Sequence, residues 1–367
     1  SAITIDKTIS GGNYGAPSLP IARELVAVPF GAEAEVKVLN YSVTDYNLAD
    51  YGIERIYPQQ ESMSKSAKPE DIVFHYDESA YQTRSLANAP KTSIEILGTM
   101  RGIRLGALQV EPVSYNPTSN TLRVFNDIEV EITFKNADIA LTEQTLLRTY
   151  SPYFDVIYRQ LFNSRAISDF YDEHPDLIKY PVKMLVVADR MFEEAMQPWI
   201  KWKTQKGFYL DVKYTDEIGN TSADIKDYVK QKYETDAPSF LILFGDQAQL
   251  PPSKMSGYDT QKVTDAYYAS IDDDYMPEMY CSRMCCETVE EMNSLIEKTL
   301  QYEQYTMPDP SYLANALLIA GYDSWYNQVV GQPTVQYVSH YYINEDNGYD
   351  NVYEYLNSYS GCYSNLS

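Results

Sequence analysis

Acidic side chains gather between residues 271 and 278, in the segment Ile-Asp-Asp-Asp-Tyr-Met-Pro-Glu. Four carboxylates at such close spacing repel one another unless water or a bound cation neutralises them. Carboxylate and carbonyl oxygens are the ligands that Ca²⁺ prefers in proteins. The segment is not an EF-hand loop, because it lacks the glycine at position six and its glutamate comes too early. The residues alone leave two interpretations open, a calcium site and a solvated acidic turn.

Two further aspartates follow apolar runs of the kind that form buried strands. Asp246 comes soon after residues 240–244, and Asp323 soon after residues 316–320. In open α/β sheets, catalytic and ligand-binding groups collect at the carboxyl ends of the strands. Both aspartates are therefore candidates for a functional site, and a loop or helix-capping role is the alternative for each.

The cysteines and histidines form no recognisable metal motif. Three of the four cysteines have the spacing C-x3-C-C, which differs from a zinc ribbon and has no histidine nearby. We expect free or structural cysteines here. These residues are Cys281, Cys285, Cys286 and Cys362, with His75, His174 and His340 elsewhere.

The first 140 residues have the pattern of short β-strands. The clearest is the stretch 122–134, where apolar and polar residues alternate, as in a strand with one buried and one solvated face. Residues 24–29, 34–39, 93–98 and 105–110 follow the same pattern. We expect an antiparallel, sandwich-like domain, from which the polar, proline-bracketed segment 57–69 projects as an exposed loop.

From residue 183 the pattern changes to alternating strands and helices. Apolar runs at 184–188, 240–244 and 316–320 are typical of buried parallel strands, and residues 210–214 form a further strand. Helices are expected around 192–206, from Ser222, and after the capping box formed by Thr288 and Glu291. The series predicts a doubly wound parallel sheet. A flavodoxin-like nucleotide site is disfavoured, because no glycine-rich loop follows residues 184–188.

Composition narrows the classes of partner. The 367 residues carry a net charge of −23, with 52 acidic and 29 basic side chains. A surface of this charge would repel a phosphate backbone, so nucleic acid is not expected as a partner. The sequence contains no run of 18 apolar residues, so it predicts no membrane-spanning helix.

Several segments resemble the gingipain family of cysteine peptidases, and most of all its lysine-specific branch. The catalytic-domain resemblance is carried by residues 206–212, 262–265, 274–280, 317–321 and 331–334. Residues 62–66, 97–102 and 151–154 resemble the propeptide of the same precursors and its junction. The segments occur in the same order as in the family, over nearly the whole chain.

The resemblance implies a structural calcium site in this sequence. Its ligands would be the carboxylates of Asp246, Asp274 and Glu278, together with main-chain oxygens of Ile271 or Asp272 and of Met276. With the family in view, calcium becomes the preferred interpretation of the acidic segment.

The resemblance also implies roles in catalysis and activation. Asp323 falls on the position of the acid that orients the catalytic histidine, but no histidine or cysteine here matches the family's catalytic pair, so both are expected downstream of this chain. Arg165 and Ala166 stand where related precursors are cut. Lys65 is expected to block the specificity pocket as a non-productive substrate, with Lys68 as its neighbouring competitor.

We therefore predict an α+β multidomain chain. Residues 1–165 form a β-sandwich-like prodomain with a linker, and residues 166–367 form the first, caspase/gingipain-like α/β subdomain of the catalytic domain. The expected function is the zymogen portion of a secreted or cell-surface cysteine endopeptidase, acting on protein substrates after lysine. Its partner would be the downstream catalytic subdomain of the same precursor. The alternative is a non-catalytic, secreted, calcium-stabilised protein-binding module.

Overall fold

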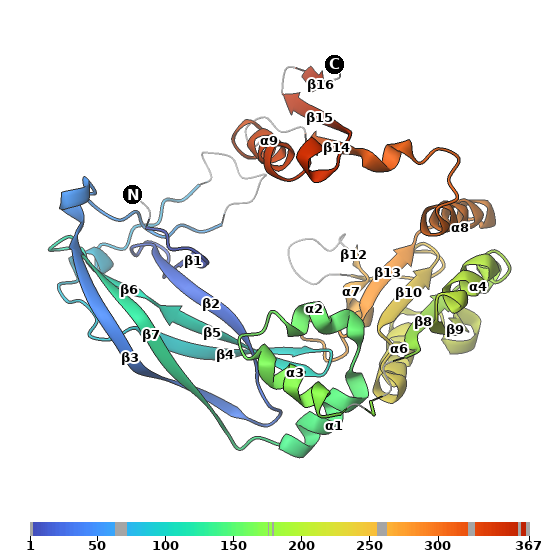
Figure 1. Cartoon of the computed structure of the whole chain (residues 1–367), viewed down its shortest axis with the longest axis horizontal. Helices are drawn as coiled ribbons and strands as arrows, with labels where there is room; N and C mark the ends of the chain where they lie inside the picture. The colour runs from blue at the N-terminus through green and yellow to red at the C-terminus, as the bar shows by residue number, and fades with distance from the viewer. Residues whose placement is uncertain are drawn as a thin grey trace. The chain divides into compact units, whose positions relative to one another are not determined.

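A computed structural model describes residues 3–62, 72–174, 176–177, 180–254, 263–321, 327–358 and 361–364. The chain divides into two compact units. Unit 1 comprises Ser1–Ser62 and Val73–Ile296, and unit 2 comprises Met63–Ile72 and Glu297–Ser367. The expected fold class, antiparallel sheets followed by an α/β region, is confirmed (Figure 1).

Unit 1 begins with two antiparallel sheets that pack face to face. One sheet has the strand order β1-β2-β5-β4, and the other has the order β3-β7-β6. Val26 and Leu108 of the first sheet share a core with Val36 and Ile132 of the second, which makes this region a sandwich. The strands are β1 (Thr8–Gly11), β2 (Leu19–Ala27), β3 (Glu33–Asn47), β4 (Lys91–Met100), β5 (Ile103–Glu111), β6 (Val113–Asn116) and β7 (Thr121–Lys135).

Three helices follow the sandwich and pack on one end of it. They are α1 (Ile139–Thr149), α2 (Asp155–Tyr158) and α3 (Ser164–Asp172). Leu146 of α1, Tyr158 of α2 and Ile167 of α3 share a core with Ile103 and Leu105 of β5. The chain around residue 165 is therefore helical and folded onto the sandwich.

The second half of unit 1 is a four-stranded parallel sheet with the order β13-β10-β8-β9. Side chains alternate across it: Leu241 and Leu243 face the core that includes α6, while Phe244 meets the Trp199 ring of α4 at 5.1 Å. Helices therefore cover both faces. The elements are β8 (Val182–Ala188), α4 (Gln197–Gln205), β9 (Phe208–Tyr214), α5 (Thr215–Ile218), α6 (Ser222–Asp236), β10 (Phe240–Phe244), α7 (Ala266–Ala269) and β13 (Tyr280–Met284), with a short hairpin of β11 (Ser253–Lys254) and β12 (Val263–Thr264). Helix α8 (Val289–Gln304) begins in unit 1 and ends in unit 2.

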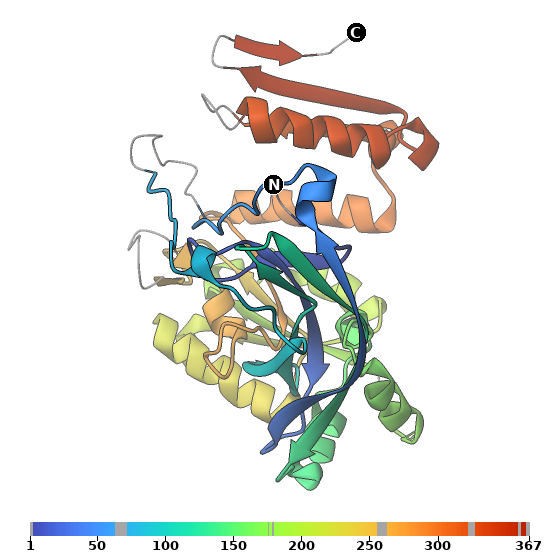
Figure 2. The same cartoon turned by 90° about the vertical axis from the view of Figure 1, so that its left-hand side faces the viewer.

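Unit 2 contains its own sheet. In it β14 (Asn315–Ala320) runs parallel to β15 (Asn351–Ser358), which pairs antiparallel with β16 (Gly361–Ser364). Helix α9 (Gln332–Tyr341) packs against β14 and β15 (Figure 2). The prediction that residues 316–320 extend the parallel sheet of unit 1 is therefore wrong, since hydrogen bonds place them in this separate sheet.

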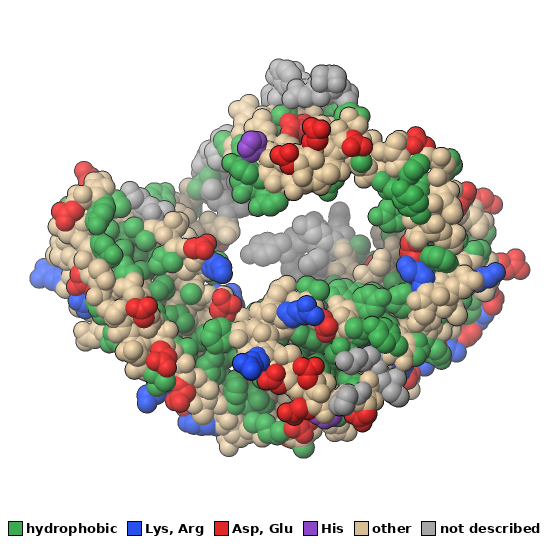
Figure 3. Space-filling view, viewed as in Figure 1, with side chains coloured by type: hydrophobic (Ala, Val, Ile, Leu, Met, Phe, Trp, Pro, Cys, Tyr) green, Lys and Arg blue, Asp and Glu red, His purple; other side chains and the backbone are tan. Residues whose placement is uncertain are grey.

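Acidic and basic side chains are interspersed on the face seen in Figure 3. None of the described helices is long and apolar enough to cross a membrane.

Candidate metal centre

The acidic segment 271–278 is a loop between α7 and β13. Carboxylate oxygens of Asp272, Asp274 and Glu278 all lie within 4.8 Å of one another. Tyr280, two residues beyond Glu278, pairs with Phe240 at the start of β10. The loop therefore lies at the amino-terminal edge of the parallel sheet.

Glu278 is the buried member of the group, with only 1% of its surface exposed. Its Oε2 accepts a hydrogen bond from the Ile271 N–H at 2.6 Å, whereas its Oε1 has no hydrogen-bond partner among the described residues. Burial, with the nearby charges of Asp272 and Asp274, raises the pKa of Glu278 to about 8. Burial and the charge of Asp274 also raise the pKa of Asp272. A buried carboxylate oxygen without a donor, beside two more carboxylates, is the environment that a hard divalent cation satisfies.

Lys226 of α6 forms hydrogen bonds to the chain just before the acidic loop. It is 5% exposed, and its ammonium group donates to the main-chain oxygens of Tyr267 and Ser270. It also pairs with the Asp273 carboxylate at 3.1 Å. Asp273 is thereby occupied by an internal cation, which leaves Asp272, Asp274 and Glu278 as the cluster.

The sandwich contributes a second contact to the loop, through the hairpin of β4 and β5. The Thr99 N–H donates to Asp274 Oδ2 at 2.6 Å, and the Met276 N–H donates to Asp274 Oδ1 at 2.9 Å. A Cβ atom added at Gly98 would collide with the Asp274 carboxylate, so the close approach requires glycine there. Both oxygens of Asp274 are thus oriented by main-chain donors.

The structure does not bring Asp246 to this loop. Asp246 follows the carboxyl end of β10, where its N–H bonds to the Cys286 carbonyl, while Glu278 precedes the paired amino end of β13. A five-residue strand separates these edges, which corresponds to roughly 16 Å at ~3.3 Å per residue. The expected ligand set is corrected to exclude Asp246. Ile271, Asp272 and Met276 lie in the loop as expected, and whether their main-chain oxygens bind a cation stays a prediction.

Two of the predicted site residues, Asp323 and Lys65, lie outside the described residues. Arg165 is described: it is exposed in the first turn of α3 and pairs with Asp169 at 3.6 Å. The Ala166 N–H bonds to the Asn163 carbonyl at 3.0 Å. A peptidase binds its substrate as an extended strand, so cleavage here would require this turn to unfold first.

Two of the cysteines, Cys281 and Cys286, have environments that favour the neutral thiol. Burial raises the pKa of Cys281 to about 12 and that of Cys286 to about 11. Their thiols point at main-chain oxygens, Cys281 at Asp265 and Cys286 at Met284. Cys281, Cys285 and Cys286 are free cysteines. A thiol that stays protonated is a poor nucleophile, which fits a structural role.

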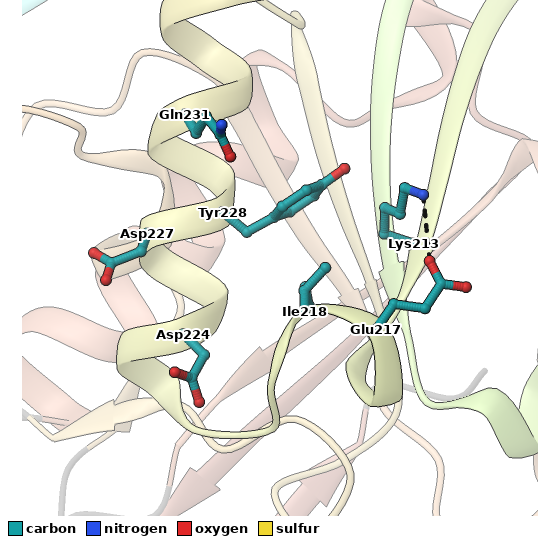
Figure 4. A pocket seen from close by; sticks show the side chains of 7 residues that line it. All are labelled: Lys213, Glu217, Ile218, Asp224, Asp227, Tyr228 and Gln231. Carbon is teal, nitrogen blue, oxygen red and sulfur yellow. Dashed lines mark hydrogen bonds and ion pairs between the residues drawn. The ribbon is translucent and has the colours of Figure 1, made fainter.

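A groove of about 580 Å³ lies between α6 and the carboxyl end of β9 (Figure 4). Five of its seven lining residues are charged or carry an amide group, including Lys213, which pairs with Glu217 at 3.3 Å. Ile218 and the Tyr228 ring supply its apolar surface, whereas small-molecule pockets are lined mainly by apolar groups. The groove lies away from the acidic loop, and we assign no site to it.

Comparison with known proteins agrees with the two halves of this architecture. A model of the C25 propeptide matches residues 1–149, and a model of peptidase family C25 matches residues 178–364. Lys-gingipain HG66 of Porphyromonas gingivalis is 46% identical over 375 residues, which cover 100% of this chain. This chain spans 21% of the length of that relative.

Two further matches have lower sequence identity and cover a smaller share of this chain. Gingipain R2 of Porphyromonas gingivalis is 24% identical over 91% of this chain and 44% of its own length. A solved structure that addresses the zymogenic latency of gingipain K from the same organism is 39% identical, with a TM-score of 0.35. It covers 37% of this chain and 75% of that one.

Proposed function

Because the chain belongs to peptidase family C25, we propose that it forms the front part of a secreted or cell-surface cysteine endopeptidase precursor that cleaves proteins after lysine. A gingipain-type propeptide is followed here by the first part of the C25 domain. The catalytic histidine and cysteine would be supplied by the remaining sequence of the precursor, in the downstream subdomain that is this chain's partner.

One observation carries the proposal that the precursor is latent: the propeptide is seated in the α/β region through the tip of its β4–β5 hairpin. Arg101 at this tip is 1% exposed and donates to the main-chain oxygens of Ala237 and Glu278. The Tyr280 hydroxyl of β13 reaches back to the Tyr153 carbonyl at 3.0 Å. A propeptide docked in this way would stay with the peptidase until it is cleaved, and Lys65 is the residue with which we propose that it blocks the specificity pocket.

A calcium ion would be held by the carboxylates of Asp272, Asp274 and Glu278, with main-chain oxygens of the loop completing its shell. The unpartnered Oε1 of buried Glu278 supports this assignment. Bound calcium would balance the negative charge of these three carboxylates. The loop would then be fixed at the edge of the sheet, so the role of the metal is structural.

Asp323 would hold the imidazole of the downstream histidine in the tautomer that accepts a proton from the cysteine. The thiolate would attack the substrate carbonyl, and the imidazolium would then protonate the leaving amine. Cleavage between Arg165 and Ala166 would separate the propeptide from the peptidase.

The test uses the full precursor, activated by removal of its propeptide. Peptide p-nitroanilides ending in lysine should be hydrolysed at least about 100-fold faster than those ending in arginine, since a pocket that pairs an ammonium group does not fit the guanidinium fork. Iodoacetamide should abolish the activity. Equal rates on both substrates would refute the lysine preference, and no hydrolysis at all would favour the non-catalytic calcium-stabilised binding module.

A further inference from the structure

The tip of the β4–β5 hairpin is a two-residue turn made of Arg101 and Gly102, between the paired residues Met100 and Ile103. Both turn residues have positive φ, 50° for Arg101 and 76° for Gly102, as in a type I′ turn. A Cβ atom on Gly102 would collide with the Thr149 hydroxyl oxygen. An arginine at a hairpin tip is normally solvated, yet here the whole tip is buried.

The guanidinium of Arg101 is surrounded by oxygen acceptors. Nη2 donates to the Ala237 carbonyl at 2.6 Å and to the Ser239 hydroxyl at 3.3 Å. Nη1 donates to the carbonyls of Pro238 and, at 3.2 Å, Glu278. Nε donates to the Thr149 carbonyl at 2.7 Å. Every donor nitrogen is therefore used, and each faces a different direction.

The charge of this buried guanidinium is balanced by dipoles. All its hydrogen-bond partners among the described residues are carbonyl or hydroxyl oxygens. Ala237 is the C-terminal cap of α6, where the helix dipole is negative and favours a cation. The rings of Phe154 and Tyr233 lie 5.2 and 5.5 Å from the guanidinium carbon and close it off from water.

A second arginine binds the same helix end. Nη1 of Arg148 donates to the Tyr233 carbonyl at 2.9 Å and to the Glu234 carbonyl at 3.3 Å. Both arginines precede residue 149, where the propeptide match ends, while the acceptors at 233–239 lie in the C25 region. The propeptide thus supplies the hydrogen-bond donors that the last turn of α6 and its following turn would otherwise obtain from water.

We propose that the main-chain oxygens at the C-terminal end of α6, with the Glu278 carbonyl, form a guanidinium-binding site, which the propeptide fills with Arg101. The site selects arginine over lysine. A planar fork reaches carbonyls in several directions at once, whereas an ammonium group is a single point with three donors. Arg101 is accordingly the residue on which docking of the propeptide to the first subdomain depends most.

Chemical rescue in the full chain tests this site. Arg101→Gly removes the side chain without backbone strain, because glycine readily adopts a φ of 50°. Loss of several charge-assisted hydrogen bonds should speed hydrogen exchange at residues 233–239 by about 100-fold. Ethylguanidinium at millimolar concentration should slow this exchange in Arg101→Gly at least tenfold, and ethylammonium should not. Arg101→Lys should exchange nearly as fast as Arg101→Gly.

Arg104→Lys is the matched control, since Arg104 also donates to main-chain oxygens, those of Pro29 and Ala32, but within the propeptide. It should leave exchange at 233–239 within twofold of wild type. Arg148→Lys gives a second test if the Arg101 variants fail to fold, and it should raise exchange in the same segment by about tenfold. Equal rescue by both cations, wild-type protection in Arg101→Lys, or unchanged exchange in Arg148→Lys would overturn the proposal.

Discussion

Replacing Glu278 by glutamine tests whether the acidic loop binds a cation, because Glu278 is the buried carboxylate of the cluster. The change keeps the shape of a side chain that is 1% exposed but removes the charge of the carboxylate whose Oε1 has no partner. In calcium-free buffer at pH 7 the variant should lie within about 1 kcal/mol of wild type, because a carboxyl group whose pKa is raised to about 8 is largely neutral there. Glutamine is also neutral and keeps an oxygen that can accept from the Ile271 N–H. With calcium, the variant should lose the stabilisation that wild type gains.

The size of that gain follows from mass action. A ligand at 100 times its Kd adds about 2.7 kcal/mol to the free energy of unfolding. For unit 1, with an unfolding entropy of about 2.1 cal/mol/K per residue, that corresponds to a rise in Tm of about 4–5 °C. We therefore expect calorimetry to show this rise for the wild-type chain and less than about 2 °C for Glu278→Gln.

Asp246→Asn is the control, because Asp246 lies at the opposite edge of the sheet. It should keep the full calcium-dependent rise in Tm. A rise of wild-type size in Glu278→Gln, or its loss in Asp246→Asn, would show that the cation binds elsewhere.

Three further predictions concern the loop, the junction and the inhibitory segment. Lys226→Met should lower the free energy of unfolding by about 3 kcal/mol in urea titrations, because the carbonyls of Tyr267 and Ser270 lose a buried charged donor; a loss below about 0.5 kcal/mol would contradict this reasoning. Arg165→Gln should abolish the new N-terminus at Ala166 when the precursor is activated, as read by terminal sequencing, and an unchanged start would place the cut elsewhere. Lys65→Ala should weaken inhibition of the mature peptidase by the propeptide at least tenfold in Ki, on the scale of one lost charge-assisted contact, whereas an equal Ki would rule out the blocking lysine.

Much of the architecture could be predicted from local patterns. The alternation at 122–134 lies in β7, and the apolar runs at 184–188 and 240–244 lie in β8 and β10. The capping box at the start of α8 is present, with the Thr288 hydroxyl accepting from the Glu291 N–H at 3.3 Å and the Glu291 carboxylate accepting in return. Such signals depend on neighbouring residues, which is why one sequence suffices to find them.

The error over Asp246 has a specific origin. The rule about carboxyl ends of strands located Asp246 correctly at the end of β10, but the acidic loop lies at the other edge. That edge is decided by β13, whose sequence Tyr-Cys-Ser-Arg-Met has no apolar alternation to mark it as a strand. Had residues 280–284 been recognised as a strand, Glu278 would have been placed just before the amino end of that strand, away from Asp246.

The burial of two basic side chains could not be predicted from sequence patterns either. Arg101 and Lys226 look like surface residues, because lysine and arginine are almost never fully buried without partners. Most of their partners here are main-chain oxygens from segments more than 40 residues away, and any residue type supplies such an oxygen. The same limit applies to the apolar run at 316–320, which pairs with β15 in a separate sheet although its composition matches that of β8.

The most direct test of latency compares the full precursor before and after the propeptide is released. Hydrolysis of a lysine p-nitroanilide peptide should be below about 1% of the final rate before release, on the scale of a tightly docked inhibitor, and should appear as the propeptide dissociates. The activity should then disappear with iodoacetamide. Full activity while the propeptide remains bound would contradict the account.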